Sequence, residues 1–159
     1  MMLIRMRTRS VVWLAALIAA AACAGCSAPT ASQESLEKEF EETLSGSVLE
    51  GSFTINDREP DRLRTERYEI HGVTKLGAGI WTFNTRIQYG DRDVTLPIPV
   101  RVEWAGDTPM VSLTDAEIPG LGTFSARVLF YRGQYAGTWS HGDTVGNQFG
   151  RIIKKPSGS

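Results

Sequence analysis

The 159-residue sequence has few of the residues on which several specialised classes of protein depend. It contains only two cysteines, both within the first 26 residues, and only two histidines. This scarcity of cysteine excludes a disulfide-stapled scaffold. The 17 Lys and Arg residues nearly balance the 18 Asp and Glu residues, which excludes a strongly basic nucleic-acid-binding protein. There is no collagen-like or low-complexity repeat, and the length suits one ordinary domain.

The N-terminal segment lacks an apolar run long enough to cross a membrane. Arg5, Arg7 and Arg9 precede an uncharged apolar stretch over residues 11–22, whereas a transmembrane helix needs about 20 apolar residues. A basic region followed by a short apolar region is typical of a secretory signal peptide. We therefore predict a cleaved signal over residues 1–25 and an exported protein.

The end of this segment contains both cysteines. Its residues Ala24-Gly25-Cys26 resemble the lipobox of bacterial lipoproteins, and Ala20-Ala21-Ala22-Cys23 is a competing site. The resemblance implies lipidation of Cys26, with Cys23 as the alternative, and anchoring in a membrane that faces the periplasm or the cell surface. A plain exported protein is the other interpretation. Loss of the three signal arginines makes the mature chain net acidic, which argues against a grip on nucleic acid or anionic lipid.

A tether and one helix are predicted ahead of the main domain. Residues 26–33 are small and polar, as in a flexible tether. Over residues 34–46 an apolar residue recurs at every fourth position among glutamates, at Leu36, Phe40 and Leu44. This spacing predicts an amphipathic helix, N-capped by Ser32. Because Lys38 is its only basic residue, we expect the helix to pack on the domain and not on a membrane surface.

Residues 47–155 switch to a period of two, which predicts antiparallel strands with one apolar face. The longest alternation is Val94, Leu96, Ile98, Val100, Val102 and Trp104. Seven turn signals divide this region into eight strands with short connections, which favours an eight-stranded antiparallel up-and-down barrel. Pro97 and Pro99 cannot donate to a ladder, so we expect a bulge or a free edge beside them. Residues 156–159 are predicted to be a disordered tail.

This β region, from Gly51 to Ile153, resembles the calycins, the up-and-down barrels that include lipocalins and avidin-like proteins. In lipocalins a Gly-x-Trp in the first strand packs against a basic residue near the last strand. The matching positions here are Gly51, Phe53 and Arg151, with Phe53 in place of the Trp. The resemblance implies an architecture and no particular activity.

The sequence predicts no catalytic and no metal site. His141 follows Ser140 and precedes Asp143, but strand alternation puts Ser140 and His141 on opposite faces, so they do not form a triad. His71 lies among charges on the second strand. We also expect a salt-bridged outer face on this strand, formed by Asp61, Arg62, Arg64, Glu66, Arg67 and Glu69.

The aromatic residues of the predicted inner face are open to two interpretations, a filled core or the lining of an apolar pocket. The candidate ligand-binding residues are Trp81, Phe83, Trp104, Phe130 and Trp139. The leading hypothesis is a noncatalytic envelope lipoprotein without a cofactor, carrying a small hydrophobic ligand in the barrel. The alternatives are a protein-interaction module with a solid core and an enzyme using the His141 end of the barrel.

Overall fold

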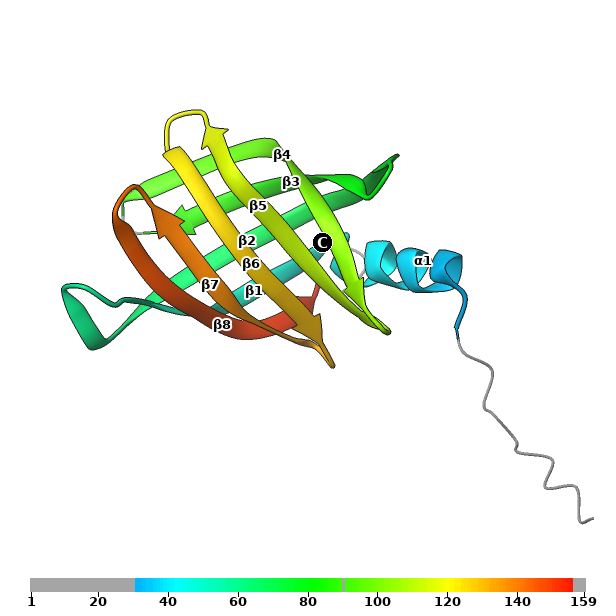
Figure 1. The fold of residues 1–159 in the computed structure, drawn as a ribbon, viewed down its shortest axis with the longest axis horizontal. Coiled ribbons are helices and arrows are strands. Elements are labelled where there is room, and N and C mark those ends of the chain that lie inside the picture. Colours follow the sequence, from blue (N-terminus) through cyan, green and yellow to red (C-terminus); the bar gives the residue numbers. More distant parts are fainter. Residues whose placement is uncertain (1–30, 90, 156–159) are drawn as a thin grey trace, which may run out of the picture. The chain divides into compact units, whose positions relative to one another are not determined.

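The computed structural model, which describes residues 31–89 and 91–155, contains one helix and a closed antiparallel barrel (Figure 1). The helix α1 spans Gln33–Leu44. The strands are β1 (Ser47–Ile55), β2 (Glu59–Gly77), β3 (Ile80–Tyr89), β4 (Arg92–Ala105), β5 (Thr108–Ile118), β6 (Gly122–Tyr131), β7 (Gln134–His141) and β8 (Thr144–Lys154). Each strand pairs with the next, and β8 pairs with β1. The predicted mainly β, up-and-down barrel is therefore confirmed, and it is consistent with a calycin-like fold.

Helix α1 begins directly after the predicted N-cap and ends at Leu44, two residues before the predicted bound at residue 46. The Ser32 hydroxyl accepts a hydrogen bond from the Ser35 amide at 3.2 Å, which satisfies one of the free donors at the N-terminus. The helix stops before Gly46, whose φ of +69° suits glycine. Phe40 and Leu44 are its buried residues, so the helix packs on the domain.

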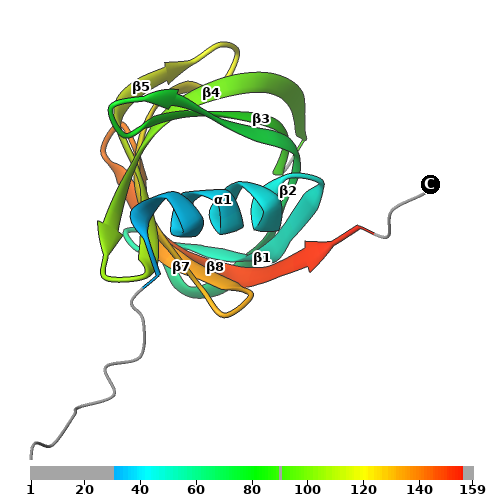
Figure 2. The same ribbon diagram turned by 90° about the vertical axis from the view of Figure 1, so that its right-hand side faces the viewer.

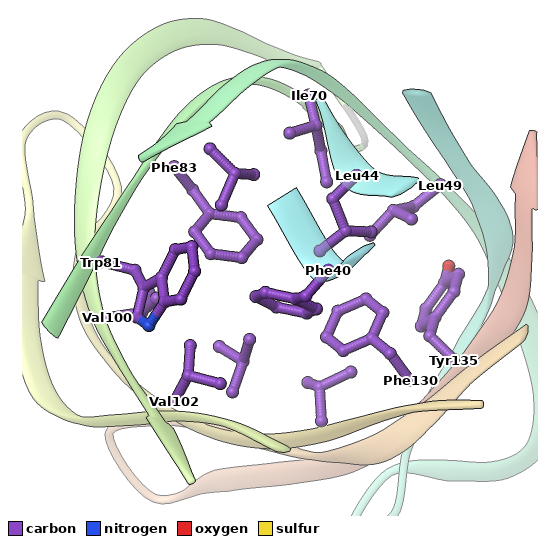
Figure 3. Close-up of a cluster of buried hydrophobic side chains, with 13 residues drawn as sticks. Phe40, Leu44, Leu49, Ile70, Trp81, Phe83, Val100, Val102, Phe130 and Tyr135 are labelled. Carbon is purple, nitrogen blue, oxygen red and sulfur yellow. The ribbon is translucent and has the colours of Figure 1, made fainter. Parts of the chain in front are cut away.

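Helix α1 lies across one end of the barrel (Figure 2). Phe40 points into the interior and contacts the rings of Trp81, Phe83, Trp104 and Phe130, with centroid separations of 5.4–6.1 Å. In Figure 3, Phe40 stands at the centre of this cluster, between Phe83 and Phe130. We call this filled region the plug: α1 together with the rings that Phe40 contacts. It closes one end of the barrel.

Polar contacts hold the plug in place. Lys154 of β8 donates to the Glu42 carbonyl and, at 2.6 Å, to the Ser45 carbonyl. A cation is favourable at this position because helical carbonyls at a C-terminus carry partial negative charge. The Ser45 hydroxyl also accepts from the Val73 amide at 3.0 Å.

Strands β4 and β5 pair over a short length only, from Arg101↔Ser112 to Ala105↔Thr108. The Val102 amide donates to the Gly79 carbonyl on the β3 side. By alternation, Pro97 and Pro99 occupy positions whose amides would face β5, and proline has no N–H to donate. Of the two outcomes expected beside these prolines, a bulge or a free edge, the pairing shows the free edge.

The lipocalin-like contact suggested by the sequence is not reproduced. Phe53 packs edge-on against Trp139 at a centroid distance of 5.7 Å, and Arg151 is exposed. The predicted signal, both cysteines, most of the tether and the tail at 156–159 lie outside the described residues. Within residues 31–89 and 91–155, no helix is long and apolar enough to cross a membrane.

Residues 31–159 form one compact unit. This unit contains every strand of the barrel and the helix that closes it, so each strand finds its hydrogen-bonding partners inside the unit. The two described clusters of buried hydrophobic residues also lie within it. We therefore take residues 31–159 as a unit that folds on its own.

Candidate functional site

The barrel interior contains a cavity of about 210 Å³ that is partly open to solvent. Its lining includes Phe83 and Phe130 at the edge of the plug and continues to Ile118 and Leu121 at the opposite end of the barrel. Most of the lining is aliphatic or aromatic. The cavity therefore begins where the side chains of α1 stop filling the barrel.

The five candidate ligand-binding residues do not all lie in one place. Phe83 and Phe130 belong to the plug and also line the cavity, and Trp139 lines the cavity alone. Trp81 and Trp104 pack against Phe40 in the plug and are not part of the lining. A filled core describes the half of the barrel that α1 enters, and the lining of an apolar pocket describes the other half, which α1 does not reach.

Glu66 is the one acidic residue of this lining, and sequence analysis placed it wrongly. It was expected on the salt-bridged outer face of β2, yet its side chain lies inside the barrel and the residue is only 5% exposed. Its neighbours Arg67 and Glu69 do face outward and pair with each other. The alternation itself carried the signal, since Glu66 shares its parity with Tyr68 and Ile70, which both face inward.

Two tyrosines hold the Glu66 carboxyl group. The Tyr68 hydroxyl donates to Oε2 at 2.9 Å, and the Tyr135 hydroxyl donates to Oε1 at 2.8 Å. Among the described residues, no Lys, Arg or His forms an ion pair with Glu66. Its carboxyl group is therefore hydrogen-bonded but lacks a counter-charge.

Two glycines allow Tyr135 to reach Glu66. Cross-strand pairing places Tyr135 of β7, Gly150 of β8, Gly51 of β1 and Glu66 of β2 in one row. A Cβ atom on Gly150 would lie 2.6 Å from Tyr135 Cε1, and one on Gly51 would collide with the Tyr135 hydroxyl. The phenol ring thus lies flat over two strands, in space that only glycine leaves free.

Burial has the largest effect on the pKa values of Glu66 and Tyr135. It raises the pKa of the Glu66 carboxyl group above its ordinary value, and the hydrogen bonds from Tyr135 and Tyr68 offset part of that effect. The pKa of the Tyr135 phenol is raised as well, first by burial and then by the neighbouring Glu66 charge. An ionised Glu66 is consequently costly among the apolar residues of this cavity.

A few other polar side chains lie in or near the cavity wall. Thr85 and Gln148 belong to the lining and are 5% and 9% exposed. The indole Nε1 of Trp139 is buried without a hydrogen-bond acceptor among the described residues, and it lies against Gly146. Arg64, on the same face of β2 as Glu66, is bonded to Glu59 at 2.6 Å.

His141 lies at the end of the barrel away from α1, where its ring stacks on Phe124 at 4.3 Å. Ser140 is its neighbour on the alternate face of β7, and no hydrogen bond links the two side chains in the described structure. His71 is exposed on the outer face of β2. The part of the chain that the structure describes contains no group of three or more His, Cys, Asp or Glu residues able to hold a metal ion.

Comparison of the sequence with protein-family models and with curated proteins finds no match. The fold and the site therefore define the class without help from relatives: a small closed antiparallel barrel, plugged at one end by a helix, with an apolar cavity that contains one buried carboxyl group. The functional argument rests on the chemistry of this cavity.

Proposed function

We propose that this protein is a membrane-anchored envelope lipoprotein that binds a small hydrophobic molecule inside its barrel without catalysing a reaction. The observation that carries the binding part is the 210 Å³ apolar cavity, which the plug leaves unfilled. Protein interiors are otherwise packed about as densely as organic crystals, and a cavity of about 150 Å³ is known to take up benzene. A drug-sized ligand needs about 300 Å³ or more, so the expected ligand is smaller than that.

Native mass spectrometry of residues 31–159, purified gently after expression in a bacterial envelope, tests the binding part. We expect an added mass that reports the bound ligand. Ala126→Leu should remove it, because Ala126 lines the cavity and the larger side chain occupies the same space. Ala136→Leu is the matched control, since Ala136 is exposed on the outer face. A bare wild-type mass, together with no uptake of toluene in an NMR titration, would contradict the proposal.

The anchoring part rests on the lipobox-like residues at Cys26. We expect Cys26→Ser to release the full-length protein from bacterial membranes, because the thioether to diacylglycerol then cannot form. Cys23→Ser is the control and should leave the protein attached. Persistent attachment of Cys26→Ser with release of Cys23→Ser would move the anchor to the alternative cysteine.

A protein partner is a second candidate, favoured by an apolar row on the outside of the barrel. Leu129, Ala136 and Phe149 face one another across β6, β7 and β8, and both Leu129 and Phe149 are more than 40% exposed. A contiguous exposed apolar surface marks an interaction site more often than scattered residues do. Phe149→Ser should weaken crosslinking to an envelope protein, whereas Ala126→Leu should not.

A further inference from the structure

Glu66 has hydrogen-bonding capacity that the barrel does not use. An ionised carboxylate offers about four lone-pair sites, and the two tyrosine hydroxyls occupy two of them. The group lines the cavity, so its remaining sites can face a ligand there. What the carboxylate lacks is a positive charge, since the described lining contains no Lys, Arg or His.

The cavity wall adds no positive charge of its own. Aromatic rings such as Phe53, Phe124 and Trp139 line it, and a ring whose face meets a ligand attracts a cation there. An anionic ligand would meet Glu66 and these rings without any base to balance its charge. The nearest base along the inner face of β2, Arg64, is not part of the lining: a terminal nitrogen pairs with Glu59, and its Nε is buried without an acceptor among the described residues.

Cavity size limits the ligand further. About 210 Å³ is enough for a benzene-sized ring plus a short chain, but not for a long acyl chain. The aliphatic and aromatic part of the lining matches an apolar body, and Glu66 provides one polar contact on the wall.

Building on the proposed binding function, we infer that the cavity selects a small protonated amine with an apolar body, an arylalkylamine or a branched alkylamine, whose ammonium group pairs with the Glu66 carboxylate. Tyr68 and Tyr135 orient the carboxylate, each with one donated hydrogen bond. The ligand supplies the counter-charge that the barrel omits. Binding of this kind transfers no proton and forms or breaks no covalent bond.

The test compares three probes of similar shape on residues 31–159 by isothermal titration calorimetry: 2-phenylethylamine, n-propylbenzene and 3-phenylpropionate. At about pH 8.5 an alkylamine remains protonated, because amines of this kind resemble the Lys side chain with a pKa of about 10.4. We expect the amine to bind about tenfold tighter than the hydrocarbon, or more, because hydrogen bonds to a charged group are among the stronger ones. The acid should bind most weakly.

Matched variants assign the preference to Glu66. Glu66→Gln keeps the shape of the side chain but removes its charge and replaces one acceptor oxygen with an NH₂ donor, to which one of the two tyrosine hydroxyls must turn as an acceptor. The preference for amine over hydrocarbon should disappear while hydrocarbon binding remains. Glu117→Gln removes one carboxylate from an exposed position on β5 and should retain the wild-type preference. This control distinguishes pairing of the amine with buried Glu66 from general attraction of an amine to an acidic protein.

A readout on the wild-type protein alone keeps the inference testable if Glu66→Gln does not fold. Amine binding favours the ionised carboxylate, so it should lower the pKa of Glu66 measured by the NMR shift of its side-chain carbonyl carbon. Tyr68 and Tyr135 are the other titratable groups that face Glu66, and the remaining described lining residues from the other strands do not titrate. An unchanged Glu66 pKa in the presence of saturating amine would overturn the inference.

The two proposals fail in distinguishable ways. If the hydrocarbon binds and the amine binds no tighter, the selection of amines is wrong and the binding function stands. Tighter binding of the acid would also overturn the inference, since Glu66 would then act as a protonated donor. If none of the three probes binds the folded protein, both proposals are contradicted.

Discussion

At the α1 end of the barrel, Phe40 contacts four aromatic rings, and Leu44 is completely buried. At the opposite end, aromatic rings of the same kinds border an unfilled cavity with a buried carboxyl group. Both halves are built from the same alternating strands, so the strand pattern does not separate them. The difference comes from one helix, which fills one half and leaves the other available to a ligand.

This comparison assigns stability mainly to the plug and places the proposed ligand binding in the cavity. A close-packed cluster gains many small dispersion contacts, and a cavity wall forgoes those contacts on its open side. A buried carboxyl group without a counter-charge costs free energy further. Changes in the plug should therefore cost more stability than matched changes around the cavity.

The same substitution in both halves is the sharpest way to break the comparison. Leu44→Ala in the plug should lower the free energy of unfolding by about 4–5 kcal/mol, near the upper end of the range for buried leucines. Leu121→Ala beside the cavity should cost about 2–3 kcal/mol, because Leu121 already borders empty space. Urea denaturation of residues 31–159 measures both. Equal losses would mean that the two halves are packed alike.

The glycine row beneath Tyr135 should respond strongly to one methyl group. Gly150→Ala places a Cβ 2.3 Å from the Glu50 carbonyl oxygen and 2.6 Å from Tyr135 Cε1, so the β1 backbone and the ring must both shift. We expect a loss of about 1–3 kcal/mol and displacement of the phenol from Glu66. The displacement should raise the pKa of Glu66, since the hydrogen bond from Tyr135 lowers it. Gly72→Ala is the control, because nothing lies within 4 Å of the added Cβ. A Gly150→Ala protein as stable as Gly72→Ala would contradict this account.

The buried carboxyl group makes a pH-dependent contribution to stability. Because the folded pKa of Glu66 is raised above its ordinary value of 4.5, its contribution is fully present below about pH 4.5 and is lost as pH rises through the folded pKa. Glu66→Gln should therefore gain stability relative to wild type between pH 4.5 and pH 8, by about 1.4 kcal/mol for each unit of pKa shift. Subtracting the two denaturation profiles cancels the other carboxyl groups. A constant difference across that range would show that the folded pKa is not raised.

The smallest effect is expected on the outer face of β2. Hydrogen bonds from Lys155 and Arg67 lower the pKa of Glu69 to about 2, and Arg86 lies 3.7 Å from its carboxylate. The contribution of Glu69 is present above about pH 4.5 and lost as pH falls towards about 2, the opposite sign to that of Glu66. Glu69→Gln should cost less than about 1 kcal/mol at neutral pH, because its partners are solvent-exposed. A loss comparable to that of Leu44→Ala would be inconsistent with this comparison.

Much of the fold follows from local patterns. The spacing of Leu36, Phe40 and Leu44 predicted α1, and Ser32 predicted its start. The alternation in Val94–Trp104 predicted an inward apolar face, and Pro97 and Pro99 predicted the free edge of β4. These signals are local, because helix and strand periods depend on neighbouring residues and proline acts at its own position.

The candidate site was predicted only in part. Phe83, Phe130 and Trp139 were identified as inward-facing rings, but Trp81 and Trp104 could not be separated from them. The separation depends on how far α1 enters the barrel, which is a long-range packing outcome. Glu66 was missed because a glutamate between two arginines has the pattern of a solvated strand face, although its alternation with Tyr68 pointed inward.

The sequence by itself determined the elements, their order and the inward face of most strands, because each depends on residues a few positions apart. Only the tertiary structure decided which half of the interior is filled, and that Tyr135 meets Glu66 across Gly150 and Gly51. Tyr135 and Glu66 are 69 positions apart in the chain. They come together only because β8 closes on β1, and barrel closure is a property of all eight strands at once.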